Sequence, residues 1–355
     1  SSFGMVLSVK IRKIICSVMN ISYFCKLKFR LNMDELGTIR QPVADDLLRY
    51  KQLFDAALAH DDDFLGQALK HVRARQGKMM RPLLVLLVAR ELGEVGQVSL
   101  LSAVTLELLH TASLVHDDVV DNSGERRGQA SANAVYGNKV AVLLGDYLLS
   151  KSLSVAAQTG RVECVSLIAR LGERLSEGEI FQLANIRNAE STEEAYFHII
   201  RNKTAELFAT CAHLGALSAG GSDDFVEHAR KFGEIVGICF QIRDDIFDYY
   251  DDAAIGKPTG NDMAEGKLTL PAIYALRHSD NPEIKALAAA IKGLTASRED
   301  IHRMVELTKS AGGIDYAWSV MQRLRQEALA ELSAFRNGEV KRALEGYLDL
   351  SLIHI

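Results

Sequence analysis

Two acidic clusters with the same spacing are the residues of this sequence best suited to chemistry. They comprise Asp117, Asp118 and Asp121 in the first cluster, and Asp244, Asp245 and Asp248 in the second. Both have the pattern Asp-Asp-x-x-Asp, and each follows a long apolar stretch that we expect to be helical. The i, i+4 spacing of the first and last members puts those two carboxylates on one helix face.

Carboxylates crowded beside apolar residues repel one another, and burying them without partners would be costly. Each cluster also lies at the C-terminal end of its helix, where the helix dipole disfavours negative charge. One such cluster would be interpreted as a solvated helix end, but two that break the same local rule indicate function. Oxygen ligands suit Mg²⁺, which completes its shell with water and substrate phosphates. The pair therefore predicts Mg²⁺ bridging a phosphate-bearing ligand to all six aspartates.

Basic residues lie near the clusters in the sequence. They are Lys78, Arg81, Arg126, Arg127, Lys203, Lys257 and Lys267. Any one of them alone would be interpreted as a solvated surface charge. Together they supply two sets of cations, enough for two diphosphates. No serine–histidine or cysteine–histidine arrangement for nucleophilic catalysis is apparent.

The elements that must position these residues are helices. The five prolines lie at the edges of apolar segments, where a helix can begin. The stretches between them carry Leu, Ala, Glu, Lys and Arg instead of the alternation typical of strands. Helices are expected over residues 42–60, 82–92, 98–121, 139–157, 162–186, 192–219, 223–250 and 268–276. The fold class is therefore predicted to be all-α.

Composition excludes several classes of protein. With 48% hydrophobic and 25% charged residues, the bulk of the chain is typical of a soluble globular protein. The net charge is −5, but residues 1–33 carry +6, which leaves −11 on the remainder and argues against a nucleic-acid partner. The five scattered cysteines indicate reduced thiols in a cytosolic or matrix-like compartment, and we expect a cytoplasmic location. The longest apolar run, residues 83–89, is far below the roughly 20 residues of a membrane span, so no transmembrane segment is predicted.

The start of the chain differs from the rest in composition. Residues 1–32 mix apolar and basic side chains without an acid. They are compatible with a transit peptide or an amphipathic membrane-surface helix, whereas lysines and arginines interrupt the apolar core of a signal peptide. The favoured interpretation is extraneous sequence ahead of a start at Met33. Residues 1–32 are thus an extraneous, targeting or anchor segment, and 33–355 are predicted to form a single domain.

The ordered motifs resemble those of the trans-isoprenyl diphosphate synthases, also called the polyprenyl synthetase family. The resemblance covers roughly residues 42–276 and rests on both acidic clusters, on Arg126-Arg127-Gly128, Lys203-Thr204 and Phe240-Gln241, and on residues 256–271. The family often has Gly-Gly-Lys-Arg in its first basic motif, where this chain has Gln76-Gly77-Lys78-Met79. The resemblance implies an isoprenoid-synthase-type bundle with a central cavity, a homodimer, and isopentenyl and allylic diphosphates as substrates.

The resemblance also implies a role for each residue. The six aspartates would hold Mg²⁺ on the allylic diphosphate, and the residues expected to contact that diphosphate are Arg126, Lys203, Thr204, Gln241, Lys257 and Lys267. Isopentenyl diphosphate would bind to Lys78, Arg81, His110 and Arg127. The catalytic residues would be Asp117, Asp118, Asp121, Lys203, Asp244 and Lys257.

The helix before the first cluster bears on product length. In the family, bulky residues four or five positions before the motif block the tunnel for the growing chain. Those positions hold Ser113 and Ala112. Simple helix packing would also explain them, but small residues about one turn, roughly 5–6 Å, below the metals favour a product of about eight to ten isoprene units. We therefore expect an octaprenyl diphosphate synthase supplying a quinone side chain, with peripheral membrane contact for product release.

Two alternatives stay open. A short-chain synthase of the geranylgeranyl or farnesyl type would share the same motifs. A non-catalytic subunit of a heteromeric synthase typically loses one or both acidic clusters, whereas this chain keeps both.

Overall fold

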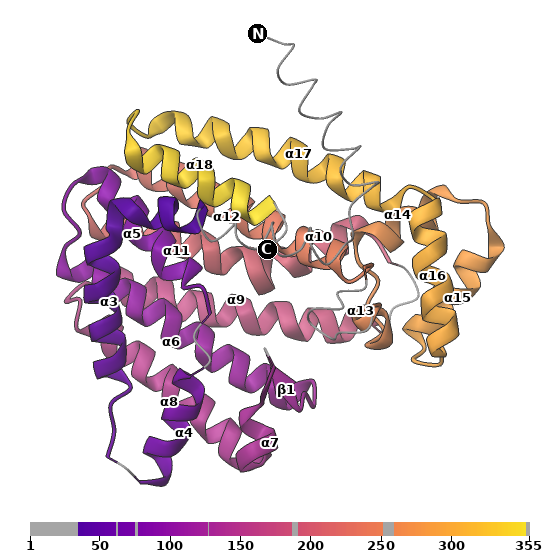
Figure 1. Ribbon diagram of the computed structural model, residues 1–355, viewed down its shortest axis with the longest axis horizontal. Helices are drawn as coiled ribbons and strands as arrows, with labels where there is room; N and C mark the ends of the chain where they lie inside the picture. Colours follow the sequence, from indigo (N-terminus) through magenta and orange to yellow (C-terminus); the bar gives the residue numbers. More distant parts are fainter. Residues whose placement is uncertain are drawn as a thin grey trace.

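The computed structural model of the chain describes residues 35–61, 63–74, 77–126, 128–186, 191–250 and 259–352 (Figure 1). The predictions for residues 1–32, Arg127 and Lys257 lie outside the described residues. Within those ranges the chain is a bundle of helices, and its only strands are the antiparallel pair β1 (Glu125–Arg126) and β2 (Gln129–Ala130). The prediction of an all-α protein is confirmed.

The long helices expected from the apolar stretches are all present. The elements before the hairpin are η1 (Gln41–Val43), α3 (Ala44–Ala57), α4 (Phe64–Arg73), α5 (Met80–Leu92) and α6 (Gln97–Val120). The hairpin is followed by α7 (Ala132–Tyr136), α8 (Asn138–Ala157), α9 (Val162–Ile186), α10 (Glu193–Ile200), η2 (Arg201–Ala205), α11 (Glu206–Ser218) and α12 (Asp223–Phe247). The remaining elements are α13 (Asn261–Ala264), α14 (Leu270–His278), α15 (Pro282–Lys292), α16 (Arg298–Ser310), α17 (Gly313–Glu331), η3 (Leu332–Ala334) and α18 (Glu339–Leu352).

The stretch 192–219, expected to be one helix, is interrupted. Between α10 and α11 the backbone forms a π-helical turn, η2. Such turns are rare and occur frequently at functional sites. This one carries Lys203 and Thr204, two of the residues predicted to bind substrate.

The core sets the spacing between the two acidic helices. Helix α11 packs against both α6 and α12, the helices that end in the acidic clusters. Two glycines allow the α12 backbone to approach η2 and α11 closely. A Cβ at Gly233 would lie only 2.5 Å from the Phe208 carbonyl oxygen, and one at Gly237 only 2.6 Å from Ala205 Cα. Helix α5 packs against α6, α11 and α18, and its residues 83–89 are fully buried.

Two described helices, α6 and α8, are long and apolar enough to cross a membrane by length and composition alone. In α6, 72% of the most apolar segment is buried in the bundle, so its hydropathy reflects its place in the core. In α8 only 39% is buried. Its outer face exposes Val142, Leu143 and Leu153, with Leu143 67% exposed.

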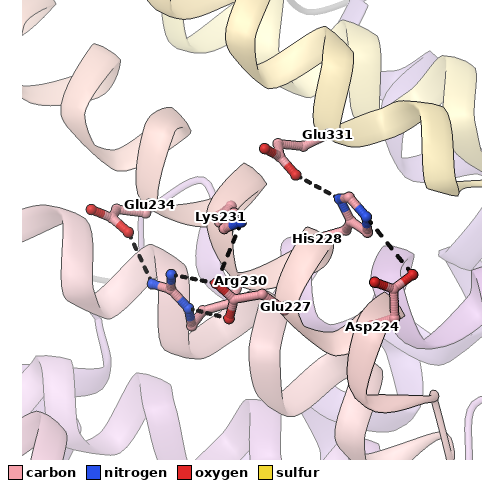
Figure 2. A network of polar contacts seen from close by, with 7 residues as sticks. All are labelled: Asp224, Glu227, His228, Arg230, Lys231, Glu234 and Glu331. Atoms are coloured by element: carbon pink, nitrogen blue, oxygen red, sulfur yellow. Dashed lines mark hydrogen bonds and ion pairs between the residues drawn. The ribbon is translucent and has the colours of Figure 1, made fainter.

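The outer face of α12 is tied to α17 by a network of polar contacts (Figure 2). His228 Nδ1 donates to Glu331 Oε2 of α17 at 2.6 Å. Arg230 pairs with Glu227 and with Glu234, each at 2.9 Å. The His228–Glu331 contact links the N-terminal half of α12 to α17, whereas the Arg230 pairs lie within α12 itself. The acidic cluster lies at the other end of this helix.

Candidate active site

The ends of α6 and α12 border two hollows that share lining residues. The inner cavity, of about 160 Å³, is lined among others by Lys203, Thr204, Gln241, Asp245 and Asp262. The outer groove is bordered by Asp121 of the first cluster. Gln182, Lys267 and Lys292 line both hollows, and they therefore mark the boundary between the two clusters.

Lys267 is the cation between the clusters. Burial alone would lower the pKa of its ammonium, but Glu265, Asp121 and Asp262 outweigh this effect and raise the pKa. Its Nζ is paired with Glu265. Asp121 follows the last residue of α6, and Asp262 lies beside the second cluster. Carboxylates near both clusters therefore act electrostatically on this lysine.

Asp117 faces a cluster of charges from three elements. Burial raises the pKa of its carboxyl to about 6, while Lys203 acts to lower it and Glu179 to raise it. Lys203 of the η2 turn is ion-paired with Glu179 of α9. The π-helical turn thus presents its lysine towards the first acidic cluster.

Asp118 is buried in the protein. It is 1% exposed. Arg126, in β1, donates from Nε to its carboxylate at 2.6 Å. The Asn133 side chain donates to its backbone carbonyl at 3.0 Å. The expected contact of Arg126 with substrate is therefore accompanied by an internal ion pair that holds the β-hairpin against α6.

Asp245 is the inward member of the second cluster. It is 3% exposed and accepts hydrogen bonds from Tyr196 Oη at 2.6 Å and Gln241 Nε2 at 2.7 Å. Gln241 Oε1 in turn accepts from Thr204 Oγ1 at 2.8 Å. Burial, with the Asp262 carboxylate, raises the pKa of Asp245. This hydrogen-bond chain joins the η2 turn to α12.

Asp248 caps the next helix. Its carboxylate accepts from the backbone N–H groups of Asn261 and Asp262, at 3.0 and 3.1 Å. The cap brings Asp262 into the inner cavity, where burial and the Asp248 charge raise the pKa of Asp262 to about 6. The second cluster therefore includes a fourth carboxylate from α13.

Asp244 is the most exposed aspartate of the second cluster, with 44% of its side chain accessible. Arg243 Nη2 donates to it at 2.7 Å. The Arg243 guanidinium is itself buried, stacks over the Phe240 ring at 4.3 Å and donates to the Leu350 carbonyl.

Burial, together with the charges of Arg243 and Arg40, lowers the pKa of Lys78.

The residues predicted for isopentenyl diphosphate are only partly gathered. A small cavity of about 50 Å³ is lined by His110, with Gly77 of the first basic motif and Asp118. Arg126, which was predicted to contact the allylic diphosphate, also lines this cavity and is not among the residues that line the inner cavity. Arg81 is not among its lining residues and lies over the Phe208 ring, 5.4 Å from the centroid. Its Nε is buried and, among the described residues, has no hydrogen-bond partner.

The two product-length positions lie on α6 as predicted from the helix. Ala112 is buried, and the half-buried Ser113 donates from its hydroxyl to the His110 carbonyl at 2.9 Å. Leu106, further down the helix, is fully buried. Their role in setting product length stays a prediction.

The donor set fits a hard divalent cation that shares its shell with a ligand. Among the described residues, no group of three or more acidic, histidine or cysteine side chains is arranged to hold a metal ion. Asp117 and Asp121 are one helical turn apart, and all the donors are oxygens, which suit Mg²⁺ or Ca²⁺. Mg²⁺ bound by few carboxylates usually completes its shell with water and substrate phosphates.

Sequence reasoning missed several functional neighbours. Glu179 and Tyr196, which contact Lys203 and Asp245, carry no motif signal because each lies in an ordinary amphipathic helix. Asp262 was visible in the motif region but had no assigned role. Arg243 stands directly before Asp244, and that adjacency was the available signal for their ion pair.

The chain is similar in sequence to known proteins. The sequence model of the polyprenyl synthetase family matches residues 62–308. The octaprenyl diphosphate synthase of Haemophilus influenzae is 35% identical over 323 residues, which cover 91% of this chain and 97% of that protein.

Two solved structures share the architecture. Geranylgeranyl pyrophosphate synthase from Bacteroides thetaiotaomicron superposes with a TM-score of 0.80 and 47% identity, covering 90% of this chain and 99% of that one. Polyprenyl synthase from Caulobacter crescentus, complexed with calcium and isoprenyl diphosphate, gives a TM-score of 0.84 and 30% identity, covering 89% and 97%.

Proposed function

The chain belongs to the polyprenyl synthetase family, and we propose that it makes octaprenyl diphosphate for a quinone side chain. It is a prenyltransferase of the long-chain polyprenyl diphosphate synthase type. The observation that carries the assignment of the site is that carboxylates from both acidic helix ends act on Lys267, which lines both hollows.

The divalent metal is proposed to be Mg²⁺. We assign its binding first to Asp117, Asp121 and Asp244. The buried carboxylates of Asp118 and Asp245 already serve internal contacts, and that of Asp248 caps α13. Asp244 is paired with Arg243 but keeps 44% of its side chain accessible. The metal would neutralise charge on the leaving diphosphate. Asp118 and Asp245 would then position the metal-binding neighbours. The metal-bound Caulobacter structure carries calcium, a hard cation of the same ligand preference.

The cations of the inner cavity are proposed to hold the allylic diphosphate. Lys203 and Lys267 provide positive charge, and Thr204 and Gln241 provide a polar wall. The allylic C–O bond breaks with its electron pair leaving on the diphosphate oxygen, so positive groups placed there stabilise the charge that develops. The double bond of isopentenyl diphosphate attacks the resulting carbocation, and the new chain loses a proton.

Isopentenyl diphosphate is proposed to bind on the opposite side of α6. His110 lines the small cavity there, and we reassign Arg126 from the allylic diphosphate to this site because it lines the same cavity. Lys78 precedes α5 and Arg81 lies in its first turn, so both would add positive charge beside the cavity. The partner-less buried Nε of Arg81 is a donor that a diphosphate oxygen would satisfy.

The long product is supported by the small side chains of Ala112 and Ser113 and by the octaprenyl name of the Haemophilus relative. The Bacteroides structure, at 47% identity, carries a geranylgeranyl name, which makes a short-chain product the competing proposal. A regulatory subunit is disfavoured because both acidic clusters are retained.

We also propose a homodimer in the cytoplasm. The outer face of α8, with Val142, Leu143 and Leu153 exposed, supplies an apolar surface of the kind that a second copy would bury. We further propose peripheral membrane contact during product release, because the long apolar product is poorly soluble in water.

The proposal is tested by product analysis. Purified protein with Mg²⁺, farnesyl diphosphate and excess isopentenyl diphosphate is expected to yield an octaprenyl chain as its main product on reversed-phase chromatography. A geranylgeranyl main product would support the short-chain alternative. Absence of any condensation by the protein alone would support the subunit alternative and overturn the proposed activity.

A further inference from the structure

Lys292 occupies a place in the site that no motif predicted. It is the last residue of α15, which forms a pair with α16 and packs against α13 (Figure 1). Its side chain lines both the inner cavity and the outer groove. The chain thus brings a lysine from a distant C-terminal helix to the boundary that Lys267 marks.

The surroundings of Lys292 orient its ammonium. Nζ donates to the Ser191 hydroxyl at 3.0 Å, which ties the end of α15 to the segment before α10. Burial lowers the pKa of Lys292. Partial removal of an ammonium from water is unfavourable, and an anion bound beside it would compensate that cost.

An ordinary explanation exists for a lysine at this position. A cation in the last turn of a helix interacts favourably with the negative end of the helix dipole. That explanation does not require the side chain to line a cavity, and it applies equally to a lysine facing solvent. Lys292 instead shares both hollows with Lys267, and the inner cavity also contains Lys203. Three ammonium groups from η2, the α13–α14 connection and α15 therefore surround the inner cavity.

We propose that Lys292 is a further diphosphate-binding residue, whose ammonium contacts the allylic diphosphate where the inner cavity meets the outer groove. The inference rests on the proposed function and adds a residue to its binding set. A diphosphate carries several negative charges, and a cation placed at its outer side stabilises both the bound substrate and the departing leaving group. Isopentenyl diphosphate, assigned to the cavity on the other side of α6, would not contact Lys292.

The test uses Lys292→Gln, with Lys285→Gln as the matched control, because Lys285 is an exposed lysine on the same helix. Binding of inorganic pyrophosphate in the presence of Mg²⁺ is measured by calorimetry. Steady-state KM values are measured for farnesyl diphosphate and for isopentenyl diphosphate. Melting temperatures of all variants are compared with that of the wild type.

Lys292→Gln is expected to weaken pyrophosphate binding and raise the KM for farnesyl diphosphate by about tenfold, the usual scale for a hydrogen bond to a charged group. The KM for isopentenyl diphosphate should stay within about twofold of wild type. Lys292→Arg keeps the charge and should restore most of the affinity. The control should match wild type throughout.

Equal pyrophosphate affinity in Lys292→Gln and Lys285→Gln, with normal condensation by the wild type, would overturn this inference and leave the proposed function intact. An equal rise of both KM values would also overturn it, because it would indicate a general structural effect. A wild-type protein that neither bound pyrophosphate nor condensed substrates would remove the proposed function and this inference with it.

Discussion

Replacing Asp117 by asparagine should stabilise the metal-free protein and suppress turnover at the same time. Burial is the main reason why the pKa of Asp117 lies at about 6 instead of 3.8, and Glu179 adds to it against the opposing effect of Lys203. A pKa that is higher in the folded than in the unfolded state means that the ionised carboxylate destabilises the fold at neutral pH. A difference of this size corresponds to about 3 kcal/mol, and solvent screening of a half-buried group lowers the expected gain to about 1–2 kcal/mol.

The stability gain has a defined pH window. Well above about pH 6, wild-type Asp117 is ionised in both states, so the whole penalty is present and the variant is the more stable protein. As the pH falls from about 6 towards 3.8, the folded wild type takes up its proton before the unfolded chain does. The difference between variant and wild type should therefore shrink over this range and vanish below it.

The assay is denaturant unfolding in the presence of a chelator, at about pH 7.5 and about pH 5, combined with turnover at saturating Mg²⁺. Turnover should fall by about 10²–10³, the scale for losing one electrostatic contact to a leaving group, and by more if a metal ligand is lost. Asp280→Asn removes an exposed carboxylate and should change neither quantity. A destabilised Asp117→Asn variant, or one with wild-type turnover, would refute the reasoning.

Three further predictions concern product length, backbone strain and the start of the chain. Ser113→Phe should shorten the product to farnesyl or geranylgeranyl length while the first condensations continue; a folded, active variant with the wild-type product would remove Ser113 from the tunnel wall. Leu294 is exposed and has φ of 55°, so Leu294→Gly should raise the free energy of unfolding by about 0.5–1 kcal/mol, and a loss on denaturant unfolding would contradict this. A chain beginning at Met33 should keep the melting temperature and turnover of the full chain, and a large loss of either would show that residues 1–32 matter to the fold or the site.

The helices were predictable because their signal is periodic and local. The apolar stretches before the two acidic clusters became α6 and α12, with the clusters at their ends. The break at η2 was not predictable, because residues 201–205 contain neither proline nor glycine, and the turn packs against α9 and α12, which are distant in the sequence.

The aspartates within each cluster also differ in their surroundings, which the motif does not indicate. Adjacent residues on a helix point about 100° apart, so Asp117 and Asp118 cannot both face the same ligand. From the sequence we predicted that all six aspartates bind the metal. In the structure Asp118 is instead paired with Arg126, and Asp245 accepts hydrogen bonds from Tyr196 and Gln241.

Long-range partners lay beyond the reach of the sequence. Glu179 reaches Lys203 from α9, and Lys292 reaches the cavity from α15, with no motif around either residue. Only the packing of distant helices brings such groups together, and a single sequence carries no signal for it.

The central claim is that the two acidic clusters act on one diphosphate. It is tested most directly by the turnover of Asp244→Asn, of Asp117→Asn and of the double variant at saturating Mg²⁺. Asp224→Asn serves as the control, because Asp224 has a 91% exposed side chain at the opposite end of α12 (Figure 2).

Each single variant should lose about 10²–10³ in rate, and the double variant should lose much less than the product of the two losses, because groups that act on the same leaving group are not additive. The control should keep wild-type turnover. Near-full turnover in Asp244→Asn, or losses that multiply as for independent sites, would contradict the claim that both clusters serve one reaction centre.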